Sequence, residues 1–204
     1  GHPFFIKDVL ETAKNNDIEL PQVPMKFLFA SEGFTEEWRE YILSLANISY
    51  ASHHGINLYG STDLLILGHE TPQSIYLKKQ AETDAAVRER VFGSRPWANV
   101  FQYNPLFRYV ESVDNDLLFT APGGVPLVRF DIGNSVTVLK YESVEDILTK
   151  QKSQTPWKLP FIILKGRNNY VLEFHLAHID PEYIRQAMDH KKYFHKFLPQ
   201  FCKK

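Results

Sequence analysis

A strand, a helix and a second strand follow one another near the N-terminus, and this order limits the folds open to the chain. Residues 25–30 form a short apolar run before a polar turn, which is typical of a buried strand. Thr35 is a suitable N-cap, two glutamates follow it, and apolar residues recur at helical spacing to about residue 47. The next strand is expected at residues 56–59. This order predicts a parallel sheet with a crossover helix.

Short β-rich segments follow further along the chain. Four of them lie between residues 99 and 139, namely residues 100–103, 108–111, 117–120 and 127–130. Turn residues separate these segments, as expected of antiparallel hairpins. We therefore predict an α/β fold in which a parallel β-α-β layer is followed by a small antiparallel sheet or distorted barrel.

Two further helices are predicted from their starting residues. Thr71-Pro72 opens a helix that is expected to reach residue 92 and to carry its charges on a solvated face. Ser143 is expected to cap a helix over residues 144–152, with Asp146 completing a capping box.

Composition excludes several classes of partner. A net charge of −1 over 204 residues gives no general attraction to polyanions, which argues against nucleic acid as a partner. The longest apolar runs are far too short to cross a membrane, and no signal pattern is seen, so we expect a cytoplasmic protein. Cys202 is the only cysteine, which excludes an intrachain disulfide and a site of several cysteines.

Residues 57–63 are the first candidate site, because they read as a buried strand that ends in a turn rich in hydroxyls. Tyr59 offers a flat face for a base, Thr62 a hydroxyl for a phosphate oxygen, and Asp63 a hard oxygen ligand for Mg²⁺. Short side chains here let an anion approach the backbone. The alternative is an ordinary strand-to-loop turn, which Gly, Ser and Asp also favour.

Four segments together resemble the adenylate-forming superfamily of acyl-CoA synthetases and peptide-synthetase adenylation domains. Residues 57–63, Asn-Leu-Tyr-Gly-Ser-Thr-Asp, resemble its Asn-x-Tyr-Gly-x-Thr-Glu motif, and residues 126–134, Pro-Leu-Val-Arg-Phe-Asp-Ile-Gly-Asn, resemble Pro-x-x-Arg-Tyr-x-x-Gly-Asp. Residues 166–169, Gly-Arg-Asn-Asn, resemble the Gly-Arg-x-Asp hinge between the large and small domains. Residues 30–39 resemble the Gly-Glu-x-x-Ser-Glu-x-x-Arg stretch of the phenylacetate-CoA ligase and coenzyme F390 synthetase branch.

The resemblance implies that the chain activates a small carboxylic acid with ATP and Mg²⁺ and passes it to CoA or another thiol. It implies that Tyr59 packs on adenine, that Thr62 contacts phosphate in catalysis and that Asp63 binds the metal. The remaining expected nucleotide contacts are Glu32, Asn57, Gly60, Ser61, Asn134 and Arg167.

The chain departs from the family at three acidic positions. Asp63 replaces a glutamate and is shorter by one methylene, which still permits a Mg²⁺ contact through water. Asn134 stands where an acid chelates the ribose hydroxyls, so the charge-assisted hydrogen bond is lost there. Asn169 stands where the hinge carries an acid.

Simpler interpretations remain open for other conspicuous residues. Arg129 and Arg167 could each form only a surface ion pair. His175 and His178 would point to opposite faces of a strand, which argues against a transition-metal site. The lysines and aromatic residues after residue 190 could suggest RNA, but a solvated amphipathic helix or frayed tail explains them as well.

By this resemblance, residues 4–98 form the α/β part of the large domain, residues 99–165 a β-rich subdomain, and residues 166–204 the start of a C-terminal α+β subdomain. No phosphate loop is seen before Glu32, and no lysine-bearing small domain follows residue 188. We therefore expect a fragment or relative of an acid–CoA ligase that is inactive as the isolated chain. The alternative is a nucleotide-binding or protein-interaction module that has lost catalysis.

Overall fold

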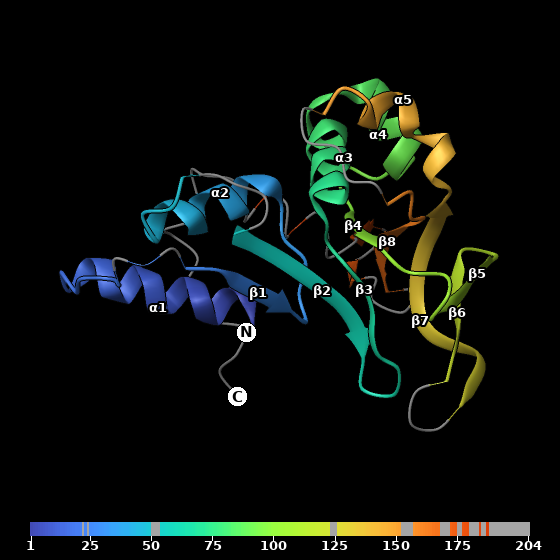
Figure 1. Ribbon diagram of the computed structural model, residues 1–204, viewed down its shortest axis with the longest axis horizontal. Coiled ribbons are helices and arrows are strands. Elements are labelled where there is room, and N and C mark those ends of the chain that lie inside the picture. The colour runs from blue at the N-terminus through green and yellow to red at the C-terminus, as the bar shows by residue number, and fades with distance from the viewer. Residues whose placement is uncertain are drawn as a thin grey trace.

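A mixed α/β fold with an open, eight-stranded sheet is seen in the computed structural model of the protein (Figure 1). The structure describes residues 1–21, 23, 25–49, 54–122, 126–151, 157–167, 172–174, 177–179, 184 and 187. The sheet has the strand order β1-β2-β3-β4-β8-β7-β6-β5. Within the described strands, β1 and β2 pair in parallel, and the other neighbouring strands pair antiparallel.

Helices and strands alternate in the first half of the chain and strands dominate the second half. The first half contains α1 (Pro3–Asn15), β1 (Phe27–Ala30), α2 (Glu36–Leu45), β2 (Gly55–Ser61), β3 (Leu65–His69), α3 (Pro72–Thr83) and α4 (Ala85–Phe92). The second half contains β4 (Asn99–Gln102), β5 (Tyr109–Val113), β6 (Asp116–Ala121), β7 (Leu127–Leu139), a 3-10 turn (Tyr141–Ser143), α5 (Glu145–Leu148) and β8 (Phe161–Arg167). A separate antiparallel pair, β9 (Leu172–Phe174) and β10 (Ala177–Ile179), follows.

Local capping signals place the helices at the centre of the chain. The Thr35 hydroxyl accepts the N–H of Trp38 at 3.2 Å and starts α2, as predicted. Thr71 and Ser74 form a reciprocal capping box at the start of α3. The single helix expected to reach residue 92 is instead two helices. Asp84 lies between α3 and α4. Its carboxylate caps α4 by accepting the backbone N–H groups of Ala86 and Val87, at 2.8 and 3.1 Å.

Two predictions about helices are wrong. Ser143 does not cap a helix, because its hydroxyl donates to the carbonyl of Lys140 at 2.6 Å and closes a 3-10 turn. The helix after it has only four described residues, Glu145–Leu148, and no side-chain cap. The helix α1 and the strand β3 were not predicted at all. A last helix, which Asp180-Pro181-Glu182 predicts through about residue 188, lies almost entirely outside the described residues.

The sheet curls so that distant strands share one apolar core. A cluster of buried residues on β2, β3, β4, β6, β7 and β8 and in the turns next to them consists of Tyr59, Leu64, Leu67, Phe101, Tyr103, Leu117, Phe119, Ala121, Val136 and Ile162. In strand order, β3, β4 and β8 lie between β2 and β7. Nevertheless, the hydroxyl of Tyr59 on β2 reaches the side chain of Asn134 on β7. The curl therefore brings together segments that the linear order of the sheet separates.

Helices cover the sheet in two groups (Figure 1). The helices α1 and α2 pack with β1 around Phe29, Trp38 and Ile42, and α3, α4 and α5 pack with β4 and β8 around Phe92 and Phe161. No helix in the described part of the chain is long and apolar enough to cross a membrane.

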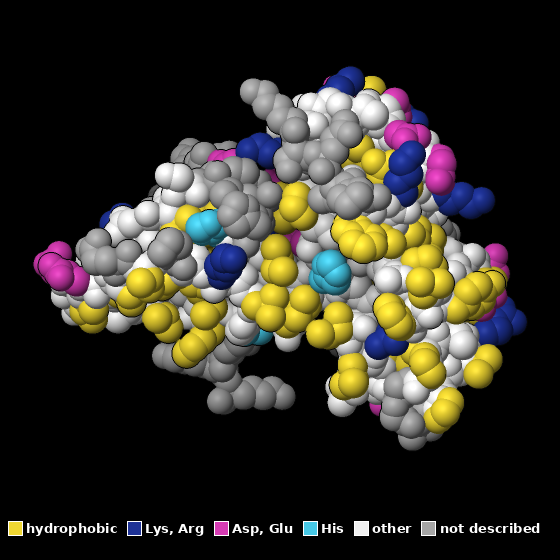
Figure 2. All heavy atoms as spheres, viewed as in Figure 1, with side chains coloured by type: hydrophobic (Ala, Val, Ile, Leu, Met, Phe, Trp, Pro, Cys, Tyr) yellow, Lys and Arg dark blue, Asp and Glu magenta, His cyan; other side chains and the backbone are white. Residues whose placement is uncertain are grey.

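One face of the molecule carries many exposed apolar side chains. Figure 2 shows them over α1, β1 and the hairpin of β2 and β3, and further over the strands at the other end of the sheet. The exposed large apolar residues include Phe5, Leu28, Leu65, Ile66 and Phe107. Where such side chains form a large contiguous patch, they are typical of a partner-binding face.

Candidate functional site

A continuous line of contacts joins the four sequence segments that suggested a nucleotide site. The side-chain amide of Asn57 donates to the carbonyl of Glu32 at 2.9 Å. Two residues along β2, the hydroxyl of Tyr59 donates to Oδ1 of Asn134 at 2.8 Å. Asn134 is paired in the β-ladder with Arg167, and its amide lies 3.4 Å from the carbonyl of Gly166. The fold therefore gathers residues from the turn after β1 and from β2, β7 and β8 in one region.

Asn57 is the most informative member of this line, because its side chain is only 2% exposed and only partly satisfied. Its Oδ1 atom has no hydrogen-bond partner in the described part of the chain. A buried acceptor left without a donor costs about 1–3 kcal/mol, and such groups are rare in folded proteins. Because protein atoms enclose this oxygen, an N–H donor from a ligand could reach it only after neighbouring side chains move.

Asn99 is a second buried acceptor near the same turn, and no local sequence pattern singled it out. Its side chain is 7% exposed, and its Oδ1 has no partner among the described residues. A Cβ atom added to Gly33 would lie 2.1 Å from Nδ2 of Asn99, so only glycine fits at this position. The turn after β1 is thus pressed against two buried amides, those of Asn57 and Asn99.

Tyr59 is more enclosed than a base-stacking residue needs to be. Its side chain is 7% exposed, and one face of its ring stacks on Phe101 with centroids 5.3 Å apart. Phe119 lies 6.3 Å away at a tilt. The open flat face predicted from the sequence is therefore not seen. An adenine ring could stack here only after the side chains that cover Tyr59 move.

The turn between β2 and β3 contains two residues that shape the hairpin and two residues whose side chains are exposed. A Cβ atom on Gly60 would lie 2.1 Å from the carbonyl oxygen of Leu65, so the hairpin requires glycine there. The hydroxyl of Ser61 accepts the N–H of Leu64 at 3.2 Å and closes the turn. Ordinary turn chemistry therefore accounts for both residues. The next two residues, Thr62 and Asp63, are exposed at the tip.

The two arginines of the motif-like segments are Arg129, whose side chain the structure describes, and Arg167, of which it describes only the backbone. Arg129 lies 3.2 Å from a carboxylate oxygen of Glu111, and both side chains are partly exposed, so it forms the surface ion pair that was one of its two interpretations. Arg167 lies at the end of β8. Its side chain and the hinge residues Asn168 and Asn169 lie outside the described residues, as do His175 and Cys202.

A buried cluster of charges next to this region was missed by the sequence reasoning. Its fully buried members are Glu36, Arg39, Glu70 and Lys78, and the partly buried Glu82 borders them. The guanidinium of Arg39 contacts both oxygens of Glu70, at 2.7 and 2.8 Å, and Glu36 at 2.8 Å. The expectation that α3 carries its charges on a solvated face is wrong for Lys78, whose side chain is 0% exposed.

The neighbours of these carboxyl groups set their pKa values. Burial opposes ionisation of Glu36, but Arg39 and Lys78 outweigh it and lower its pKa to about 2. For Glu82, burial dominates. Although Lys78 favours ionisation, burial and the nearby negative charge of Glu36 raise the pKa of Glu82 to about 7.

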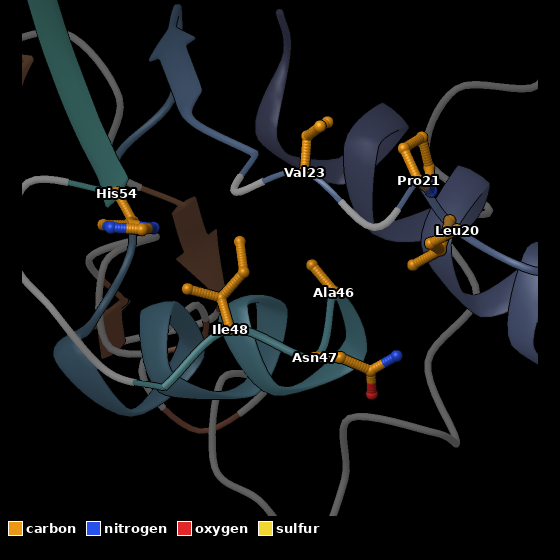
Figure 3. A pocket seen from close by; sticks show the side chains of 7 residues that line it. All are labelled: Leu20, Pro21, Val23, Ala46, Asn47, Ile48 and His54. Atoms are coloured by element: carbon orange, nitrogen blue, oxygen red, sulfur yellow. The ribbon is translucent and has the colours of Figure 1, made fainter.

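A small cavity lies at the opposite end of β2 from Tyr59 (Figure 3). Its volume is about 320 Å³, and it is lined by Leu20, Pro21, Val23, Ala46, Asn47, Ile48 and His54. Figure 3 shows Pro21 and Val23, before β1, across from Ala46 and Ile48 at the end of α2. His54 precedes Tyr59 by five residues, or about 16 Å of extended chain. The cavity is therefore separate from the line of contacts described above.

The comparisons with family models and with curated proteins assign no function to the residues of this site. No protein-family model matches the chain, and a search of curated proteins finds no match. Among the described residues, no group of three or more His, Cys, Asp or Glu side chains is arranged to hold a metal ion. Functional assignments therefore depend on the residues and their contacts.

Proposed function

We propose that the chain is an adenine-nucleotide-binding relative of the acyl-adenylate-forming ligases of the phenylacetate-CoA ligase branch. The observation that supports this most directly is the hydrogen bond from Tyr59 to Asn134, which joins two of the motif-like segments across 75 residues. The pairing of Asn134 with Arg167 adds the third segment, and the contact of Asn57 with Glu32 adds the fourth. Four weak sequence matches thus meet at one place.

The base would be recognised at the turn after β1. The exocyclic amino group of adenine is an N–H donor, which is what the buried Oδ1 of Asn57 lacks. The backbone of Glu32 lies beside it and would face the edge of the base. Asn134 and Arg167 would contact the ribose, and Tyr59 would pack against the base once it is uncovered. In this role Asn57 selects adenine over a base that presents a carbonyl at the same edge.

The triphosphate would lie over the tip of the hairpin that joins β2 to β3. Thr62 would donate its hydroxyl to a phosphate oxygen, and the backbone of Gly60 and Ser61 would lie beneath the phosphates. The exposed carboxylate of Asp63 fits Mg²⁺, which proteins usually hold with one or two carboxylates while it keeps several waters. When bound, the ion neutralises charge on the phosphates. The carboxylate of the acid would attack the α-phosphorus and release pyrophosphate, and CoA or another thiol would then attack the acyl carbon of the adenylate and release AMP.

The finer organisation of the fold belongs to the same proposal. Residues 4–98 would correspond to the parallel β-α-β layer of the large domain, residues 99–165 to a β-rich subdomain, and residues 166–204 to the start of a small C-terminal domain.

A module that binds nucleotide or a protein without catalysis is the second candidate. It is favoured by Asn134, which carries no charge and whose Oδ1 already accepts the hydroxyl of Tyr59. The exposed apolar face seen in Figure 2 favours a protein partner as well. Exchange of pyrophosphate into ATP, measured with Mg²⁺ over a panel of aryl and fatty acids, tests whether the isolated 204-residue chain is inactive, as expected. Robust exchange would overturn that expectation and exclude the module, whereas nucleotide binding without exchange agrees with both candidates.

Calorimetric titration with AMP and with Mg-ATP tests the proposed site. Tyr59→Ala should weaken binding of both ligands, and Asp63→Ala should weaken Mg-ATP binding much more than AMP binding. Glu142→Ala removes an exposed carboxylate elsewhere on the molecule and serves as the matched control. Equal affinities in the wild type and in all three variants would refute the site.

A further inference from the structure

The buried charge cluster touches the backbone of both segments that carry the candidate site. An oxygen of Glu70 accepts the backbone N–H of Asn57 at 2.7 Å, and Arg39 donates to the carbonyl of Gly55. These two bonds fix the beginning of β2. On the other segment, Lys78 donates to the carbonyl of Phe34, just after the turn that contains Glu32.

The first turn of α2 is held by the same cluster. The backbone N–H of Glu36, the first residue of α2, lies 3.1 Å from a carboxylate oxygen of Glu82 on α3. The ammonium group of Lys78 lies 3.3 Å from Glu36 and 3.7 Å from Glu70. Lys78 therefore contacts one site-bearing segment directly, at Phe34, and the other through Glu70, which accepts the N–H of Asn57. Its position depends on the carboxylates around it.

We propose that Glu70 and Lys78 are positioning residues for the candidate site, and that ionisation of Glu82 loosens their hold on its backbone. The part that concerns ligand affinity rests on the proposed function. The part that concerns the backbone does not.

Charge balance within the cluster explains the effect of Glu82. Arg39 and Lys78 carry two positive charges, and Glu36 and Glu70 carry two negative charges, so the cluster is neutral while Glu82 is protonated. Ionisation of Glu82 adds a partly buried negative charge without a matching cation, and this charge attracts Lys78 away from Phe34 and Glu70. Because burial raises the pKa of Glu82 to about 7, the change falls near neutral pH.

Other charged groups border the cluster and must be separated from Glu82 in any experiment. Arg88, on α4, donates to the backbone carbonyls of Ala81 and Glu82. The ring Nδ1 of His69 lies 3.0 Å from the carbonyl of Glu70, so His69 is a second ionisable group beside the cluster. A substitution of Glu82 alone therefore separates its contribution from that of His69.

The backbone part is tested without any ligand by nuclear magnetic resonance between pH 5.5 and 8.5. The amide signals of Asn57 and of Thr35, whose N–H adjoins the Phe34 carbonyl, should move with a midpoint near pH 7 in the wild type. Glu82→Gln should abolish this transition, and Glu40→Gln, on a half-exposed pair with Lys79, should keep it. No transition in the wild type, or the same transition in Glu82→Gln, would overturn the proposal. The second result would assign the effect to His69.

The positioning role of Glu70 is tested by rescue. Glu70→Ala removes the acceptor of the Asn57 N–H, whereas Glu70→Gln keeps an acceptor at the same distance from the backbone. The Asn57 amide signal should shift strongly in the alanine variant and return most of the way in the glutamine variant. The same shift in both variants would show that the acceptor does not position Asn57.

The ligand part uses adenosine, which has no group that titrates near neutral pH. Its affinity for the wild type should fall by on the order of fivefold from pH 6 to pH 8.5, at the low end of couplings between linked sites. Glu82→Gln should bind equally at both values. A pH-independent affinity in the wild type would overturn the link. Failure to bind at either pH, with the amide transition intact, would refute the proposed function and leave the positioning of the backbone supported.

Discussion

Replacing Glu82 by glutamine should stabilise the folded chain at alkaline pH and change little at acidic pH. The reason is the burial of Glu82 beside Glu36, which makes its ionised form costly. Glutamine has the same shape, carries no charge, and keeps an acceptor for the N–H of Glu36 at the start of α2. It therefore resembles the protonated acid at every pH.

The size of the effect follows from the difference between the folded and unfolded pKa values. In the folded chain the pKa of Glu82 is about 7, against an ordinary value of 4.5. The folded state thus holds a proton that the unfolded state has lost between these values, so stability falls as the pH rises from 4.5 to 7. Since one pKa unit corresponds to about 1.4 kcal/mol, the cost above pH 7 is about 3 kcal/mol. Glu36 has the opposite sign, because its pKa is lowered to about 2, and its contribution to stability is lost as the pH falls below 4.5.

Urea unfolding at pH 5.5 and pH 8.5 measures this difference. The wild type should lose on the order of 2 kcal/mol between the two values, and Glu82→Gln should lose much less. Glu40→Gln, which removes a half-exposed carboxylate paired with Lys79, should follow the wild type within about 1 kcal/mol. If Glu82→Gln is as pH-sensitive as the wild type, the burial of Glu82 does not control its ionisation, and the charge balance described above is refuted.

Three further substitutions test other contacts. Gly60→Ala should cost about 2 kcal/mol of unfolding free energy, because the added Cβ meets the Leu65 carbonyl. Gly133→Ala, in open space but at a φ of +69°, should cost only about 1 kcal/mol. Equal costs would argue against the close approach at Gly60. Arg39→Leu should cost about 3–5 kcal/mol in urea unfolding, because it leaves buried carboxylates unpaired. Arg90→Leu, on the exposed pair with Asp146, should cost less than about 1 kcal/mol. A small loss for Arg39→Leu would contradict the pairing within the buried charge cluster. Asn134→Asp should tighten adenosine binding in calorimetry by about 1 kcal/mol, since a charged acceptor then faces the ribose, and no gain in a folded variant would place the ribose elsewhere.

Local signals in the sequence predicted the elements that begin with a cap or end in a turn. Thr35 and Thr71 each mark a helix start by the bond their hydroxyl makes to a nearby N–H, and such bonds span only three residues. Ser143 carries the same signal but uses its hydroxyl to close a 3-10 turn, which propensity alone does not distinguish. The end of α3 was predicted too late for a similar reason. Asp84 caps a new helix there, inside a segment whose sequence pattern is typical of one continuous helix.

Long-range features could not be predicted from local patterns. The contact of Tyr59 with Asn134 depends on the curl of the whole sheet, and no short segment encodes it. Lys78 looked like a solvated charge, but α3 is buried on several sides, so charges on it meet other charges instead of water. The resemblance nevertheless picked out residues that the fold brings together. It missed Asn99 and Glu70, which act through burial and pairing.

The side-chain amide of Asn57 offers the most direct test of the proposed nucleotide site. In nuclear magnetic resonance, AMP should shift the Asn57 side-chain and Tyr59 signals, because the adenine amino group donates to the buried Oδ1. Inosine monophosphate, which has a carbonyl in place of that amino group, should bind at least tenfold more weakly, as expected when a buried acceptor is left unpaired. If neither nucleotide moves these signals, or if both bind equally, Asn57 does not recognise adenine and the account of this site is contradicted.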